Sequence, residues 1–145
     1  AGLRRAMATE FTLDPRLAGN SRAIGDLPLA HLRLVDNLAF PWVLLIPRRA
    51  AIREIHELTP TDQSQLIAEA SHVAAGMQAA FKADKMNVAA LGNAVPQLHV
   101  HVIARWAGDI CWPGPIWAGH EERPLSACQW AARESHIRAI FDAWR

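Results

Sequence analysis

The sequence has little of what marks secreted, membrane or nucleic-acid-binding proteins. It contains only two cysteines, Cys111 and Cys128, and no C-x-x-C pair, which excludes a disulfide framework and makes a reducing cytoplasm the expected location. No apolar run approaches the roughly 18 residues needed to cross a bilayer, so we expect no membrane span. The 15 basic residues nearly balance the 14 acidic ones, and the net charge of +1 excludes a broad basic surface for nucleic acid polymers or anionic membranes.

Internal repeats, linkers and low-complexity tracts are also missing, so residues 1–145 are expected to form a single domain. Apolar residues make up 51% of the chain and charged residues 20%, as in an ordinary soluble protein that buries a core. Two capping patterns predict helices. Thr59-Pro60-Thr61-Asp62 begins a long amphipathic helix that ends near Asp84, and Ser126-Ala127-Cys128-Gln129 begins a C-terminal helix.

Strand patterns occupy much of the remaining chain. Polar and apolar residues alternate over 29–36, which predicts a half-exposed strand, and the run at 43–46 is apolar enough for a central one. Residues 86–91 and 97–105 are close enough to form an antiparallel hairpin. Residues 20–28 are predicted to be loop. Residues 106–124 are predicted to be an ordered loop that buries Trp112, Ile116 and Trp117. The expected class is α+β, with an antiparallel sheet of about five strands.

The most informative stretch is Gln97-Leu98-His99-Val100-His101-Val102-Ile103-Ala104-Arg105. Successive side chains of a strand point to opposite faces, so one face of this strand is wholly apolar and the other presents an amide, two imidazoles and a guanidinium. An imidazole has an ordinary pKa of about 6.5 and can act as nucleophile, base or acid near neutrality. A chemical site on this face is therefore the leading interpretation.

Two other interpretations of the histidine pair remain open. Histidines on a strand are often structural. A metal site would need a third or fourth ligand, and no H-x-E or C-x-x-C pattern nearby supplies one, so no metal or other cofactor is expected.

The stretch resembles the signature of the histidine triad (HIT) family, His-φ-His-φ-His-φ-φ, where φ is apolar. The resemblance extends over about residues 27–114. It includes Val43-Leu44-Leu45-Ile46-Pro47-Arg48, Met86-Asn87-Val88, Gly92-Asn93 and Trp112-Pro113-Gly114, the last of which resembles a motif of one branch of the family. The branch that the chain resembles most is the diadenosine polyphosphate hydrolase-like one. The sequence departs from the family at Gln97, which stands where the family has its first histidine, and at Trp42, where many members have another. Arg49 and Ala50 stand where a further histidine often follows the Pro-basic pair.

The resemblance implies roles for particular residues. His99, the middle position, would be the nucleophile, with His101 bonding the phosphate or the bridging oxygen of the leaving group. Gln97 could orient a neighbour through its amide but could not act as an acid or a base. Substrate would also be held by Asp36 or Asn37 at the ribose, by Asn87, by Gly92 and Asn93, and by Arg105 as a source of positive charge; Asp36-Asn37 is equally explained as turn chemistry.

The implied function is a nucleotide hydrolase that attacks the α-phosphate of a dinucleoside polyphosphate or nucleoside phosphoramidate through a nucleotidyl-histidine intermediate. The resemblance also implies a homodimer. Two alternatives remain: a nucleotidyl transferase that uses a sugar phosphate as acceptor, and a nucleotide-binding module whose turnover was lost with the first histidine.

Overall fold

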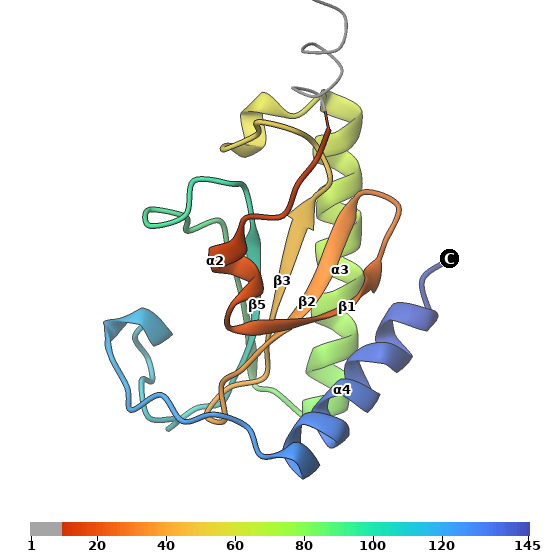
Figure 1. Cartoon of the computed structure of the whole chain (residues 1–145). Coiled ribbons are helices and arrows are strands. Elements are labelled where there is room, and N and C mark those ends of the chain that lie inside the picture. Colours follow the sequence, from red (N-terminus) through yellow and green to blue (C-terminus); the bar gives the residue numbers. More distant parts are fainter. Residues whose placement is uncertain (1–9) are drawn as a thin grey trace, which may run out of the picture.

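The computed structural model describes residues 10–145, in which one five-stranded sheet is flanked by helices (Figure 1). The strand order is β1-β2-β3-β5-β4, and every neighbouring pair is antiparallel. The predicted α+β class with an antiparallel five-stranded sheet is therefore confirmed. Within the described residues, no helix is long and apolar enough to cross a membrane.

The elements follow one another with short connections. Their bounds are α2 Pro15–Ala18, β1 Ser21–Asp26, β2 Ala30–Val35, β3 Trp42–Pro47, the 3-10 turn Ile55–Glu57, α3 Pro60–Phe81, β4 Lys85–Ala89, β5 Val100–Arg105, the 3-10 turn Ile116–Ala118 and α4 Ala127–Asp142. Helix α3 packs on one face of the sheet, and α4 lies against α3 and β1.

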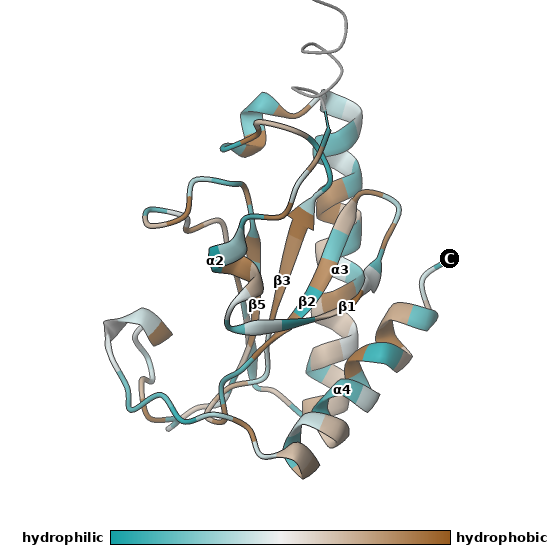
Figure 2. Cartoon of the chain, viewed as in Figure 1, coloured by the Kyte–Doolittle hydropathy of each residue, from teal (hydrophilic) through white to brown (hydrophobic). Residues whose placement is uncertain are grey.

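Both long helices begin where their capping residues predict. The Thr59 hydroxyl accepts the Asp62 backbone N–H at 3.1 Å at the start of α3, and Ser126 and Gln129 form a reciprocal capping box at α4. Helix α3 ends at Lys82, whose left-handed backbone (φ 51°) directs its N–H to the Gln78 carbonyl. In Figure 2, β3 is apolar almost throughout, whereas α3 and α4 carry both apolar and polar residues. The core therefore lies between the sheet and the apolar sides of the helices.

The predicted loop at 20–28 is wrong, because most of it forms β1. This edge strand pairs with β2, and its register shifts between Ala23 and Gly25. A Cβ at Gly25 would lie 2.6 Å from the ring of Phe141, so glycine is what lets α4 pack against the strand. Glycine indicated a loop in the sequence, but an edge strand tolerates it at a bulge.

The expectation that residues 29–36 form a half-exposed strand is also wrong, since β2 is buried along most of its length. At Val35 its second face is covered by the segment that precedes β1. Leu17 of α2 packs there with Val35, Leu44 and Ile46. The sheet therefore lies between the long helices and the segment that contains Leu17. The helix pattern of the sequence predicted only the first of these two layers.

The strand that carries the two histidines begins at Val100, three residues later than predicted. Val100 pairs with Leu45 of β3, and His101 pairs with both Leu44 of β3 and Ala89 of β4. Residues 97–99 lie outside this ladder, although the Leu98 N–H donates to the Ile52 carbonyl at 2.9 Å. The alternation of faces nevertheless continues, because Leu98 belongs to the main core, whereas the His99 ring meets that of His101.

The Trp-rich segment 106–124 is less buried than predicted. Ile116 is 2% exposed and packs with Phe40 and Ile103, but Trp112 and Trp117 are 38% and 39% exposed. The ring of Trp117 lies edge-on to that of His101, with the ring centroids 4.8 Å apart. The prediction that all three side chains are buried is therefore wrong for both tryptophans.

Candidate functional site

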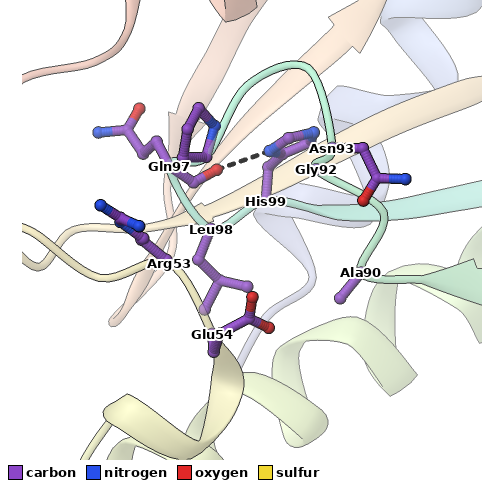
Figure 3. A pocket seen from close by; sticks show the side chains of 9 residues that line it. Arg53, Glu54, Ala90, Gly92, Asn93, Gln97, Leu98 and His99 are labelled. Atoms are coloured by element: carbon purple, nitrogen blue, oxygen red, sulfur yellow. Dashed lines mark hydrogen bonds between the residues drawn. The ribbon is translucent and has the colours of Figure 1, made fainter.

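A pocket of about 310 Å³ opens beside His99 (Figure 3). One wall is the loop between β4 and β5, with Ala90, Gly92, Asn93 and Pro96. The segment after β3 forms the other wall, with Arg53 and Glu54, and Gln97 and Leu98 complete the lining. Polar groups from two separate loops therefore surround one imidazole.

His99 is held as a single tautomer by its own chain. Its Nδ1 lies 2.7 Å from the backbone carbonyl of Gln97, drawn as a dashed line in Figure 3. A carbonyl only accepts, so Nδ1 carries a hydrogen, and in the neutral ring Nε2 therefore keeps its lone pair. Nε2 makes no hydrogen bond to the described part of the chain. The arrangement fixes a largely buried ring so that, in its neutral form, the lone pair lies on Nε2, the atom that has no partner in the described chain.

The adjacent His101 is occupied on both nitrogens. The indole N–H of Trp42 donates to Nδ1 at 3.1 Å, so Nε2 carries the hydrogen and donates to the Leu91 carbonyl at 2.9 Å. Burial lowers the pKa of His101 from 6.5 to about 4; the hydrogen bond to Leu91 opposes the shift, and the charge of His99 adds to it. His101 is therefore neutral at pH 7, and its ring meets that of His99 edge-on at 4.9 Å.

Gly92 brings the backbone close to the nucleophilic ring. A Cβ at this position would lie 2.7 Å from the Val95 carbonyl oxygen and 3.2 Å from Cε1 of His99. Only glycine permits both the tight turn and this approach. Asn93 follows it on the pocket wall, so these two predicted residues do come together with His99.

Gln97 turns its side chain away from both histidines. Its Oε1 accepts the Asp14 backbone N–H at 2.9 Å, and its Nε2 donates to the Thr12 carbonyl at 2.8 Å. The amide thus binds the N-terminal segment, while the backbone carbonyl of the same residue holds His99.

Asp36 and Asn37 lie elsewhere. They belong to the turn that leads to Trp42, at the start of β3. Trp42 pairs with Ile103 near the end of β5, whereas His99 comes just before the start of β5. The Asp36 carboxylate accepts the Leu125 N–H at 2.7 Å, and Asn37 is 1% exposed and bonded to His120 and Phe40. Their polar atoms secure the connection to α4.

Arg105 and Asn87 are likewise used within the fold. Arg105 is 1% exposed and holds the Asp109 carboxylate through Nε and Nη2 at 2.8 and 2.9 Å. Its Nη1 donates to Asn87 Oδ1 at 2.8 Å. The hydrogen bond from Arg105 lowers the pKa of Asp109 to about 2, so the pair remains charged. Neither residue lines the His99 pocket.

Sequence reasoning missed several residues of the site. Arg53 and Glu54 gave no signal, because they lie in an irregular segment whose place is set by the fold. Trp42 stands out in the sequence as a departure from the family, but the pattern does not show that its indole N–H binds His101. Thr12 and Asp14 contribute backbone groups, which leave no trace in side-chain chemistry.

Comparisons with known proteins agree with this architecture. The family model described as HIT domain matches residues 18–108. A histidine triad protein from Marinobacter aquaeolei VT8 is 41% identical, with a TM-score of 0.89 over 92% of this chain and 97% of that chain. A histidine triad (HIT) protein from Sinorhizobium meliloti 1021 is 45% identical, with a TM-score of 0.86 over 90% and 96%.

A third structure, a histidine triad protein from Bradyrhizobium japonicum, is 40% identical, with a TM-score of 0.87 over 90% of this chain and 98% of that chain. A search of the curated proteins found no match. Three matches that each cover nine-tenths of the chain at 40% identity or more show common ancestry as well as a common fold.

Proposed function

Because this chain belongs to the HIT domain family, we propose that it is a nucleotide-binding hydrolase in which His99 attacks the α-phosphate of a dinucleoside polyphosphate or nucleoside phosphoramidate. The observation that supports this most directly is the 2.7 Å hydrogen bond from His99 Nδ1 to the Gln97 carbonyl. It holds the ring so that the lone pair of the neutral imidazole lies on Nε2, beside an open pocket of about 310 Å³.

The proposed reaction has two displacements. The Nε2 lone pair forms a bond to the α-phosphorus while the bond from phosphorus to the leaving oxygen or nitrogen breaks, and that atom takes up a proton from solvent. Water then attacks the same phosphorus and loses a proton to solvent while the bond from phosphorus to Nε2 breaks, which releases the nucleotide and restores the neutral ring of His99. In the intermediate the ring is cationic, and Nδ1–H donates to a carbonyl that stabilises this charge.

Backbone N–H groups of the Gly92-Asn93 turn are the proposed donors to the phosphoryl oxygens, because the turn approaches the ring so closely. His101 supports this turn through its bond to the Leu91 carbonyl. In this geometry His101 reaches a leaving group only by giving up that bond. Asp36, Asn37, Asn87 and Arg105 are assigned no contact with substrate.

A binding module without turnover is the second candidate, and the side chain of Gln97 favours it. Both amide atoms are committed to Thr12 and Asp14, and an amide transfers no proton at neutral pH. A transferase with a sugar phosphate acceptor would use the same His99 chemistry and differ only in the second displacement.

One experiment separates the three functions. The protein is mixed with radiolabelled diadenosine tetraphosphate or adenosine phosphoramidate, quenched in alkali and examined for label on histidine. A hydrolase shows a labelled intermediate and turnover in water, and a transferase shows the label but turns over only with a sugar phosphate. Bound nucleotide without label or turnover would overturn the hydrolase proposal.

We also propose a homodimer built on β4 and α3. Strand β4 is an edge of the sheet. Val88 of β4 is 49% exposed, and Ile67 of α3 is 58% exposed. An edge strand next to exposed apolar residues favours pairing with a second copy. A cytoplasmic location is proposed from the two free thiols, Cys111 and Cys128.

A further inference from the structure

Residues 11–18 form a strap across the face of the sheet that carries the histidines (Figure 1). Leu17 is 5% exposed and packs with Leu44 and Ile46 of β3, while Phe11 and Leu13 lie against the same cluster. Val95, from the loop between β4 and β5, packs there too. The strap thus has one apolar interface with both the sheet and the loop that precedes β5.

Three hydrogen bonds join this strap to the pocket loop. Two are made by the Gln97 amide, which accepts from the Asp14 N–H at 2.9 Å and donates to the Thr12 carbonyl at 2.8 Å. The third runs from Arg16 Nη1 to the Ala94 carbonyl at 3.0 Å. The amide bonds backbone groups two residues apart, much as a neighbouring strand would.

This attachment lies where the sheet provides least support. The ladder of β5 begins at Val100, so residues 97–99 have only the bond from Leu98 to Ile52 among backbone–backbone contacts of the described chain. Yet the carbonyl that selects the His99 tautomer belongs to Gln97. The side chain of that residue is fixed by the strap, and its backbone fixes the ring.

We propose that the strap is a positioning element of the His99 site and that the side chain of Gln97 attaches it to that site. Gln97 is accordingly a positioning residue: its amide binds Thr12 and Asp14, which holds its carbonyl against Nδ1 of His99 and keeps the hydrogen of the neutral ring on Nδ1. The importance of this for turnover rests on the proposed function, in which Nε2 is the nucleophile. The positioning itself can be measured without any substrate.

The first test is Gln97→Met, which keeps the length of the side chain and removes both bonds. The Asp14 amide should exchange with deuterium about five- to tenfold faster, as expected for losing one hydrogen bond. In ¹⁵N NMR spectra at pH 8, His99 should change from the Nδ1–H tautomer to a mixture that includes Nε2–H. Gln63→Met is the matched control, because it removes an amide bond to the Leu58 carbonyl at the start of α3, outside the pocket. It should change neither signal.

A second pair of variants changes the strap at Asp14 and tests the same attachment. It remains informative if Gln97→Met does not fold. Asp14 has φ −60°, which proline adopts without strain, so Asp14→Pro removes the donor to Gln97 while retaining the backbone path. Asp14→Ala removes the same carboxylate and keeps the N–H. Only the proline variant should alter the His99 tautomer.

Two results would overturn the proposal. One is an unchanged His99 tautomer in both Gln97→Met and Asp14→Pro, which would leave the strap a purely structural cover. The other is equal effects of Asp14→Ala and Asp14→Pro, which would assign the effect to the carboxylate. Because each readout uses substrate-free protein, failure of the proposed reaction would leave these outcomes unaffected.

Discussion

Trp42 decides which nitrogen of His101 carries its hydrogen. The indole can only donate, so its 3.1 Å contact makes Nδ1 the acceptor and leaves Nε2–H for the Leu91 carbonyl. One aromatic side chain on β3 thereby supports the loop that approaches His99 from β4. In this geometry His101 holds the loop at Leu91.

Replacing Trp42 with phenylalanine should release this arrangement. The loss of one hydrogen bond should lower the free energy of unfolding by about 1 kcal/mol and give His101 a mixture of tautomers in ¹⁵N NMR spectra. Trp117→Phe is the control, since Trp117 packs on the same ring with no N–H bond to it. A single unchanged His101 tautomer in Trp42→Phe would contradict this assignment.

The depressed pKa of His101 predicts a pH-dependent stability. Between pH 6.5 and about 4 the unfolded chain binds a proton at this ring that the folded protein does not, so the stabilising effect is complete above pH 6.5 and is lost as the pH falls to about 4. The free energy of unfolding should decrease by up to about 3 kcal/mol over that window because of this residue. Urea titrations at a series of pH values give the free energy of unfolding of the wild type and of His101→Gln. Between pH 6.5 and 4 this free energy should fall more steeply in the wild type, and an equal pH dependence in the two proteins would argue against the assignment.

His99→Ala should abolish turnover while the fold survives. Removal of a covalent nucleophile typically costs a factor of at least about a thousand in rate. Hydrolysis of the labelled substrates, together with circular dichroism and thermal unfolding, checks both halves of this prediction. Near-wild-type hydrolysis by the folded variant would end the nucleophile assignment.

Gly92→Ala should reduce turnover strongly, because its Cβ would lie 2.7 Å from the Val95 carbonyl oxygen and press on the His99 ring at 3.2 Å. The backbone must shift, and a nucleophile misplaced by about 1 Å can cost a hundredfold in kcat. Gly19→Ala is the matched control, because its Cβ meets nothing nearer than 3.4 Å and its φ of −67° suits alanine. Equal activities of the two variants would show that the approach of Gly92 is unimportant.

The protein should sediment as a dimer at micromolar concentration, and Val88→Asp should make it a monomer. A charge placed on the edge strand would be buried without a partner in the paired sheet. Ile110→Asp, at a residue 67% exposed on the separate loop after β5, should leave the dimer intact. A monomeric wild type would refute the pairing of β4 edges.

Local sequence determined the regular parts of this fold. The Thr59 and Ser126 caps with their apolar periodicity predicted α3 and α4, and the apolar run at 43–46 predicted β3. These features depend on neighbours within a few residues, which any stretch of sequence displays. The alternation around the two histidines likewise predicted that His99 and His101 lie together on the face opposite the core, as their 4.9 Å ring separation shows.

Tertiary structure alone decided what the polar side chains bind. Gln97 finds its partners at Thr12 and Asp14, more than 80 residues earlier, and Arg105, predicted to hold substrate, is enclosed by Asp109 and Asn87. A hydrogen bond requires its donor and acceptor to be within about 3 Å, and which distant segments come that close depends on how the layers pack. The sequence therefore determined which groups were available for chemistry, and packing determined which of them remained free to perform it.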